Sequence, residues 1–216
     1  MLAGFHLRVT RIVLETLEPL GFALGGGYAL QVHGVTDRPS DDLDNYAASL
    51  DPAVYDAAEA ALVQATADAG LTTTVLLSDS WFREIEIRDP QTGSMVPVDL
   101  GYDYRTLPPI KIADLGPVLS LEDVIVGKTR ALADRQAPRD FYDIDAILSS
   151  GRANTDGLRE ILATIRPELP PSTLFDLLKS ARSQDTSNFA RLGMSHNDAE
   201  ALFDRLEGFA ESSTDN

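Results

Sequence analysis

The pattern of hydrophobic residues changes from strand-like to helical partway along the chain. Residues 71–104 contain three apolar runs typical of strands, with a hairpin connection at residues 89–94. Within one run, Ile85 and Ile87 alternate with charged residues, which indicates a strand with one exposed face. Beyond Ser120 the spacing of apolar residues is helical to the end. The chain therefore belongs to the α/β (α+β) class, with a mixed sheet and flanking helices in the first part and a helical bundle in the second.

The first 70 residues predict helices and short strands in alternation. In chain order we expect an amphipathic helix over residues 5–20, a strand over 22–24, a glycine break at 25–27, a helix over 28–33, a strand around Leu43 and an alanine-rich helix over 52–69.

Proline and glycine pairs mark the boundary between the two parts. Pro108-Pro109 and Gly116-Pro117 bound a segment that we interpret as a connection. We therefore predict an α/β domain over residues 1–116 and a helical domain over residues 117–211. Residues 212–216 have the composition of a disordered tail.

The overall charge limits the partners of this chain. Its 216 residues carry a formal net charge of −16, so the overall field repels nucleic acid and anionic membranes. Any contact with RNA must use a local basic segment. The chain has no cysteine, which excludes disulfides and thiolate chemistry. No apolar run approaches the roughly 20 residues that span a bilayer, and the N-terminus lacks a signal-type apolar core, so we expect a cytoplasmic protein with no membrane partner.

Two aspartates spaced for a metal site follow the glycine break. In an extended strand, residues i and i+2 point to the same side, so Asp42 and Asp44 would present two carboxylates to one spot. A hard divalent cation such as Mg²⁺ compensates such a pair and also binds phosphate oxygens. Asp99 is the best third ligand, because it points away from Val98 and its apolar neighbours on a strand that could lie beside Leu43.

The aspartate pair alone is weak evidence. An acidic chain produces D-x-D by accident, and Asp143-Ile144-Asp145 is a second instance in this sequence. The glycines upstream strengthen the case, because a glycine turn that leads into a helix exposes backbone N–H groups that can hold a triphosphate. A tight strand-to-helix turn is the alternative explanation of these glycines. Together, the glycines and the acids predict a metal–nucleotide site with phosphate contacts at Gly26 and Gly27.

A resemblance to a known family supports this interpretation. The stretch G-G-Y-A-L-x2-H-G-x3-R-P-S-D-D-L-D resembles the first motif of the nucleotidyltransferase superfamily, and most of all that of the AbiEii/AbiGii-type toxins, the group that includes the MenT toxins. The matching positions are Gly26, Gly27, Ala29, Leu30, Arg38, Ser40, Asp42, Leu43 and Asp44. A second block, KTRALADRQAPRDFYDI, is similar to another motif of that group at Lys128, Arg135, Arg139, Asp140 and Asp143. Tyr28 departs from the pattern, since many members have Ser or Thr there.

The resemblance implies an enzyme and names its residues. It implies a nucleotidyltransferase domain in which Asp42 and Asp44 hold Mg²⁺ and Lys128 neutralises the phosphates of an NTP. Asp99 would bind a second metal ion or accept the proton of the acceptor hydroxyl. Arg135 and Arg139 would assist in nucleotide binding or hold the acceptor, and Asp143 would act in the site or orient Lys128. Residues 128–139 of this block also hold four basic residues against one acid, Asp134, so the phosphates of an RNA acceptor would bind there.

The same resemblance implies a biological role. Such an enzyme would be the toxin of a bacterial toxin–antitoxin pair, with a separate antitoxin as its partner. It would transfer NMP from an NTP to the 3′ end of tRNA and so block translation.

Two other functions remain open on the sequence. The first is nucleotidyl transfer to a small molecule, such as a cationic aminoglycoside, which the negative charge favours, or to a protein hydroxyl. The second is a catalytically silent binding partner with the same fold. Convergence of Asp42, Asp44 and Asp99 within metal-bridging reach would count against the silent partner.

Overall fold

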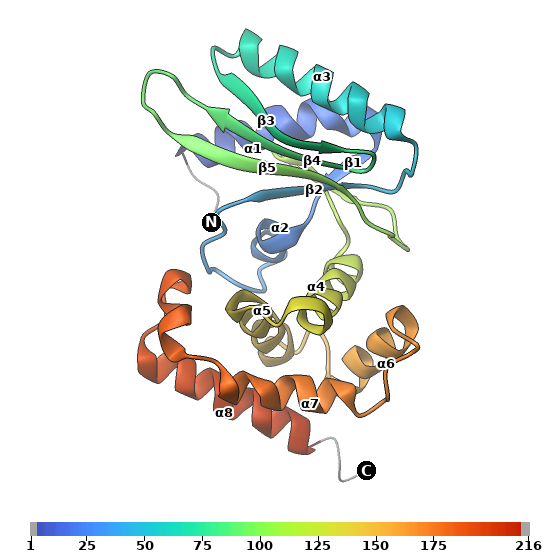
Figure 1. The fold of residues 1–216 in the computed structure, drawn as a ribbon, viewed down its shortest axis with the longest axis vertical. Helices are drawn as coiled ribbons and strands as arrows, with labels where there is room; N and C mark the ends of the chain where they lie inside the picture. The colour runs from blue at the N-terminus through green and yellow to red at the C-terminus, as the bar shows by residue number, and fades with distance from the viewer. Residues whose placement is uncertain (1–3, 213–216) are drawn as a thin grey trace. The chain divides into compact units, whose positions relative to one another are not determined.

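A computed structural model describes residues 4–212 of the chain, which divide into two compact units. One unit, here called the sheet unit, contains the residues up to His33 together with Ser40–Val124. The other, the helical unit, contains Gly34–Pro39 together with the residues from Ile125 onward. The mixed sheet and the helical bundle predicted from the sequence are therefore both present (Figure 1).

The sheet unit is built on one mixed sheet of seven strands in the order β3-β4-β5-β2-β1-β7-β6. The pairs β2–β5 and β1–β7 are parallel, and the other neighbours are antiparallel. The strands are β1 (Phe22–Leu24), β2 (Leu43–Ala47), β3 (Thr72–Asp79), β4 (Phe82–Arg88), β5 (Met95–Tyr102), β6 (Ile110–Ile112) and β7 (Gly116–Val118).

The strands β6 and β7 lie where the sequence predicted only a connection. They form a hairpin in which Ile110 pairs with Val118, and Val118 in turn pairs with Leu24 of β1. Each strand has three residues, too few for an alternating pattern to be visible in the sequence. Pairing with a buried central strand, which is a tertiary effect, gives this segment its β structure.

One face of the sheet is covered by helices and carries the hydrophobic core. The helices α1 (Gly4–Leu17) and α3 (Pro52–Asp68) pack together, and α3 also runs along β3 and β4 (Figure 1). Leu43, Val98 and Ile85 are paired across three strands and are completely buried. Because side chains alternate along a strand, Asp44 and Asp99 point to the opposite face.

The remaining helices complete the two units. The sheet unit contains η1 (Glu18–Leu20) and α2 (Gly26–Val32). The helix α4 (Leu121–Arg135) begins in the sheet unit and continues into the helical unit. The helical unit also contains α5 (Pro138–Ser149), α6 (Thr155–Ile165), α7 (Thr173–Ser180), η2 (Ala181–Ser183), η3 (Thr186–Leu192) and α8 (His196–Ser212).

The helices α7 and α8 run side by side in the helical unit (Figure 1). Of the tail predicted to be disordered, Ser212 is the last residue of α8, and residues 213–216 lie outside the described residues. None of the helices within residues 4–212 is long and apolar enough to cross a bilayer.

Candidate active site

Three aspartates of the sheet unit converge, as the sequence predicted. Asp44 of β2 and Asp99 of β5 are directly paired on parallel strands, so their side chains leave the same face of the sheet. Asp42 lies just before β2, and its carboxylate lies close to those of Asp44 and Asp99. One carboxylate oxygen from each residue lies within 4.8 Å of the others, and all three side chains are partly exposed.

This group of acids suits a hard divalent cation. Carboxylate oxygens are the ligands that Mg²⁺ prefers, at distances of about 2.0–2.1 Å, which places opposite ligands about 4.2 Å apart. The separations within the trio do not exceed 4.8 Å, so small side-chain rotations would allow a shared ion. Across residues 4–212, this is the one group of three or more potential ligands that meets the distance criterion. The residues therefore fit the Mg²⁺ that the sequence predicts.

The glycine turn lies directly against one of these acids. Gly26 has a φ of +60°, and a Cβ built on it would lie 1.7 Å from Oδ2 of Asp44. The preceding residue, Gly25, donates its backbone N–H to the Asp44 carbonyl oxygen at 2.8 Å. Both the backbone conformation and the close approach require glycine at position 26. The glycine turn therefore allows the backbone to lie against Asp44, independently of any contact that it makes with phosphates.

Two neighbouring hydroxyl groups contact the acids. Ser40 donates its hydroxyl to Oδ1 of Asp42 at 3.2 Å, and Tyr46 donates its hydroxyl to Oδ1 of Asp44 at 3.3 Å. Burial, followed by the negative charges of Asp44 and Asp103, raises the pKa of the Tyr46 phenol well above its ordinary value. Tyr46 was not among the site residues predicted from the sequence, although its i+2 spacing from Asp44 on a strand places both side chains on one face.

Tyr28, which replaces the usual Ser or Thr of the motif, is buried. The residue is 6% exposed, and the centroid of its ring lies 6.3 Å from that of the His6 ring. Burial, together with the charges of Asp41 and Asp42, raises the pKa of its hydroxyl. The ring therefore packs within the sheet unit near the acids.

The lysine of the second block is held in a buried ion-pair network of the helical unit. Lys128 is 7% exposed, and its Nζ lies 2.7 Å from Oδ2 of Asp143. Arg38 donates two hydrogen bonds to the same carboxylate, from Nε to Oδ1 at 2.6 Å and from Nη2 to Oδ2 at 2.8 Å. One fully buried aspartate therefore holds two cations, one from each sequence motif.

The network keeps Asp143 ionised. Burial raises the pKa of its carboxyl, but the charge of Lys128 and the hydrogen bonds and charge of Arg38 outweigh burial and leave the pKa below its ordinary value. Of the two roles that the sequence left open for Asp143, these contacts favour the orientation of Lys128. The participation of Arg38 could have been suspected only from its place in the first motif.

Arg135 and Arg139 occupy different environments. Arg135 makes a two-pronged ion pair with buried Asp140 of α5, with its closest contact at 2.7 Å. Lys128 and Arg135 are seven residues apart on α4, and both pair with α5, so this face of α4 is directed at that helix. Arg139 is half-buried at the second position of α5. Because Lys128 pairs with Asp143 and Arg135 pairs with Asp140, part of the positive charge of this block is neutralised.

The second D-x-D has a structural explanation. Asp143 and Asp145 are on the helix α5, where residues i and i+2 do not face each other. Asp143 pairs with Lys128 and Arg38, whereas Asp145 binds Arg205 of α8 at 2.6 Å. The same three-residue pattern therefore converges in a strand and diverges in a helix.

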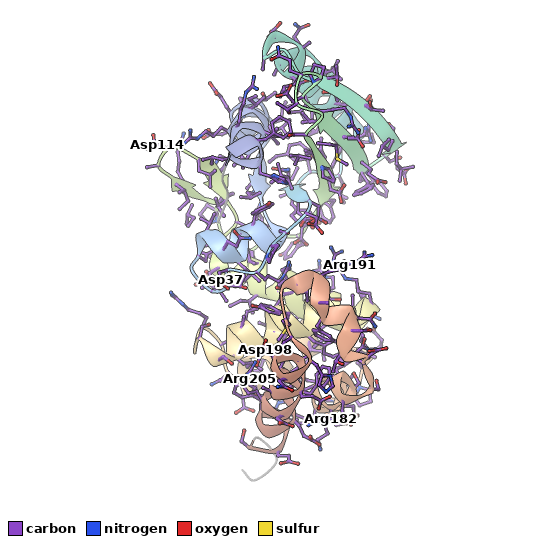
Figure 2. All side chains as sticks on the ribbon, turned by 90° about the vertical axis from the view of Figure 1, so that its left-hand side faces the viewer. Asp37, Asp114, Arg182, Arg191, Asp198 and Arg205 are labelled. Carbon is purple, nitrogen blue, oxygen red and sulfur yellow. The ribbon has the colours of Figure 1, made fainter. Side chains whose placement is uncertain are left out.

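The helical unit also contains a polar pocket of about 400 Å³. Its lining includes Asp37, Arg38, Tyr142, Asp198 and Arg205. Figure 2 shows Asp198 and Arg205 on α8, the helix in the red end of the colour scale. The guanidinium groups of both arginines are already paired with aspartates of α5, so the pocket has no surplus positive charge for a phosphate.

Comparisons with solved structures show the same fold in nucleotidyltransferases. The chain is similar to a candidate nucleotidyltransferase from H. pylori, with a TM-score of 0.63 and 18% identity over 95% of this chain and 91% of that one. It is also similar to JHP933 from Helicobacter pylori, with a TM-score of 0.61 and 18% identity over 95% and 88% of the two chains. MenT4, a nucleotidyltransferase toxin from Mycobacterium tuberculosis H37Rv, aligns with a TM-score of 0.58 and 15% identity over 97% and 84%.

The curated proteins contain no match to the chain. The family model described as "Nucleotidyl transferase AbiEii toxin, Type IV TA system" matches residues 12–206, which include both sequence motifs and parts of both units. The chain therefore belongs to the AbiEii family of nucleotidyl transferase toxins.

Proposed function

We propose that this protein is a Mg²⁺-dependent nucleotidyltransferase toxin that transfers NMP from an NTP to the 3′ end of tRNA and thereby blocks translation. The observation that carries the proposal is the convergence of Asp42, Asp44 and Asp99 within 4.8 Å, beside a glycine turn that fits around one of them. This convergence also argues against a catalytically silent partner.

In the proposed reaction, the aspartates hold Mg²⁺, which supplies positive charge to the triphosphate and to the acceptor oxygen when it is bound. Asp99 accepts the proton of the acceptor hydroxyl, whose oxygen forms a bond to the α-phosphorus. The bond from the α-phosphorus to the bridging oxygen breaks, and pyrophosphate leaves with that electron pair. Two of the three ligands, Asp44 and Asp99, lie on paired strands, which reduces the reorganisation that this step requires.

The remaining predicted residues have binding roles in the proposal. Gly26 and Gly27 present backbone N–H groups to the phosphates, and Lys128 neutralises the β- and γ-phosphates as they leave. Arg135 and Arg139 contribute positive charge for the nucleotide or the acceptor. Asp143 is a positioning residue, because its contacts in the structure are with Lys128 and Arg38.

Partners follow from the family and from the proposed reaction. An NTP and tRNA are the proposed substrates, and a cognate antitoxin protein is the proposed regulator, in agreement with the toxin–antitoxin description of the family. The overall charge of −16 requires that tRNA be bound through local groups of basic residues.

A transfer assay tests the proposal. Purified protein is incubated with total tRNA, Mg²⁺ and each labelled NTP in turn, with Asp44→Ala and EDTA as controls. We expect label on tRNA only with the wild type in the presence of metal. Transfer that persists in the Asp44→Ala variant would contradict the proposed site.

A parallel assay separates the acceptors. The negative charge of the chain also favours a cationic acceptor, so the same reaction is run with an aminoglycoside in place of tRNA. Label on the aminoglycoside with none on tRNA would keep the proposed chemistry and replace the proposed acceptor.

A further inference from the structure

Tyr46 lies on the same strand face as Asp44 and contacts its carboxylate. The two residues are separated by one position on β2, and the phenol hydroxyl donates a 3.3 Å hydrogen bond to Oδ1 of Asp44. The other carboxylate oxygen, Oδ2, lies against Gly26, where a Cβ would be 1.7 Å away. Each oxygen of Asp44 therefore has its own neighbour, and the orientation of the carboxylate is restricted from two sides.

The ring of Tyr46 is itself fixed between two glycines. A Cβ on Gly25 would lie 2.5 Å from Cδ2 of the ring, and a Cβ on Gly101 would lie 3.2 Å from Cε1 on the other edge. Gly25 has no positive φ, so its backbone does not require glycine. Gly101 is the residue of β5 that pairs directly with Tyr46. Gly25, just before α2, and Gly101, on β5, thus leave room for the ring of Tyr46.

We propose that Tyr46 is a positioning residue that holds the Asp44 carboxylate in the orientation needed to bind a divalent cation. The inference rests on the proposed metal site. Loss of a hydrogen bond to a metal ligand typically weakens metal binding by about 10–100-fold. The 3.3 Å bond is long for an O–H donor, so we expect an effect near the lower end of that range.

A different explanation is that the hydroxyl only satisfies a buried polar group. Asp44 would then accept a bond that helps the sheet unit to fold and leaves the metal site unaffected. The two explanations differ in one measurable quantity, the affinity for a metal ion in a folded variant. Activity alone does not separate them, because a loss of stability would also lower activity.

The test is direct titration of the full chain with Mn²⁺, with free Mn²⁺ measured by electron paramagnetic resonance in the absence of NTP. Tyr46→Phe removes one oxygen and keeps the ring, and we expect the Kd for Mn²⁺ to rise about tenfold. Gly25→Ala keeps the hydroxyl but displaces the ring, and it should also weaken Mn²⁺ binding. The melting temperature of each variant, recorded with EDTA, shows that it is folded.

Tyr55→Phe is the matched control. Tyr55 is fully buried in the same unit, and its hydroxyl donates to the Ser49 carbonyl oxygen at 3.0 Å, not to any of the three acids. This substitution removes the same atom and, like Tyr46→Phe, a partly buried hydrogen bond, so it reproduces a purely structural effect. We expect it to lower the melting temperature and to leave the Kd for Mn²⁺ unchanged.

The Asp44→Asn variant separates the inference from the proposed function. If Asp44→Asn weakens Mn²⁺ binding while Tyr46→Phe binds like the wild type, the role of Tyr46 is overturned and the metal site stands. If Asp44→Asn binds Mn²⁺ as well as the wild type does, the proposed metal site fails, and the inference fails with it. A tenfold loss in Tyr46→Phe but not in Tyr55→Phe supports the inference.

Discussion

The backbone of Gly26 lies against the carboxylate of Asp44, so closely that a Cβ at position 26 would lie 1.7 Å from Oδ2. The glycine turn and the acidic strand are therefore parts of one structure. No side chain other than hydrogen fits at position 26 unless Asp44 moves. This relationship leads to the first of four predictions.

Gly26→Ala should abolish nucleotidyl transfer, because the new methyl group displaces Asp44 from Asp99. Gly21→Ala is the matched control, since Gly21 also has a positive φ, +81°, but has nothing within 4 Å of an added Cβ. Both variants place a Cβ at a positive φ, which costs roughly 1–2 kcal/mol, so both should melt at a lower temperature. Transfer assays should show activity for Gly21→Ala alone, and an active Gly26→Ala enzyme would contradict the geometry described here.

Asp99→Asn should lower kcat for transfer by about 100–1000-fold, since a metal contributes several kcal/mol and each 1.4 kcal/mol is tenfold. Without metal, the same change should leave the melting temperature unchanged or raise it, because it removes repulsion from directly paired Asp44. Transfer kinetics with Mg²⁺ check the expected loss of kcat, and thermal melts in EDTA check the expected melting temperature. Glu86→Gln on neighbouring β4, where Glu86 pairs with Arg88, is the control and should retain activity.

Asp143→Asn should strongly destabilise the helical unit. The substitution leaves Lys128 and Arg38 buried without their shared counter-charge, which typically costs about 3–5 kcal/mol. Urea unfolding followed by circular dichroism measures the change in the free energy of unfolding. The control is Asp156→Asn, which breaks an exposed pair with Arg159 and should cost less than about 1 kcal/mol. Equal effects of the two variants would show that the buried network is not important for stability.

Acid should destabilise the protein through the same carboxylate. Burial raises the pKa of Asp143, but Lys128 and Arg38 lower it by a larger amount. Its folded-state pKa therefore lies below its unfolded-state value. The stabilisation is therefore fully present above the unfolded-state pKa of about 3.9 and is lost as the pH falls through the lower folded-state pKa.

The free energy of unfolding, measured between pH 7 and pH 3, should fall steeply below about pH 4. In Asp143→Asn this dependence should be weaker, because the titrating group is gone. Asp123 contributes with the same sign: burial raises its pKa, but hydrogen bonds from Thr106, Ser120 and Leu107 lower it overall. If the stability of the wild type and that of Asp143→Asn had the same pH dependence, Asp143 would not be the group whose protonation destabilises the protein.

The sequence by itself predicted the elements whose pattern is long or chemically distinctive. The alternation in residues 82–88 placed Ile85 and Ile87 in the core, and the i+2 spacing of Asp44 from Asp42 indicated that both carboxylates lie near one spot. The alternation around Asp99 predicted its side of the strand correctly. These features depend on the period of a strand, which is local and can be read from the order of residues.

Other features depended on residues far apart in the chain. Only tertiary structure decided that Asp44 pairs with Asp99, that residues 110–118 form strands, and that one buried aspartate, Asp143, holds Lys128 and Arg38. Asp44 and Asp99, like Arg38 and Asp143, are more than 50 positions apart, and Lys128 lies on a different helix from Asp143. The strands within residues 110–118 are too short to leave a pattern in the sequence. Local sequence specifies the direction of a side chain, whereas its partner is specified by which elements pack together, because burial makes unpaired charges and unpaired backbone groups costly.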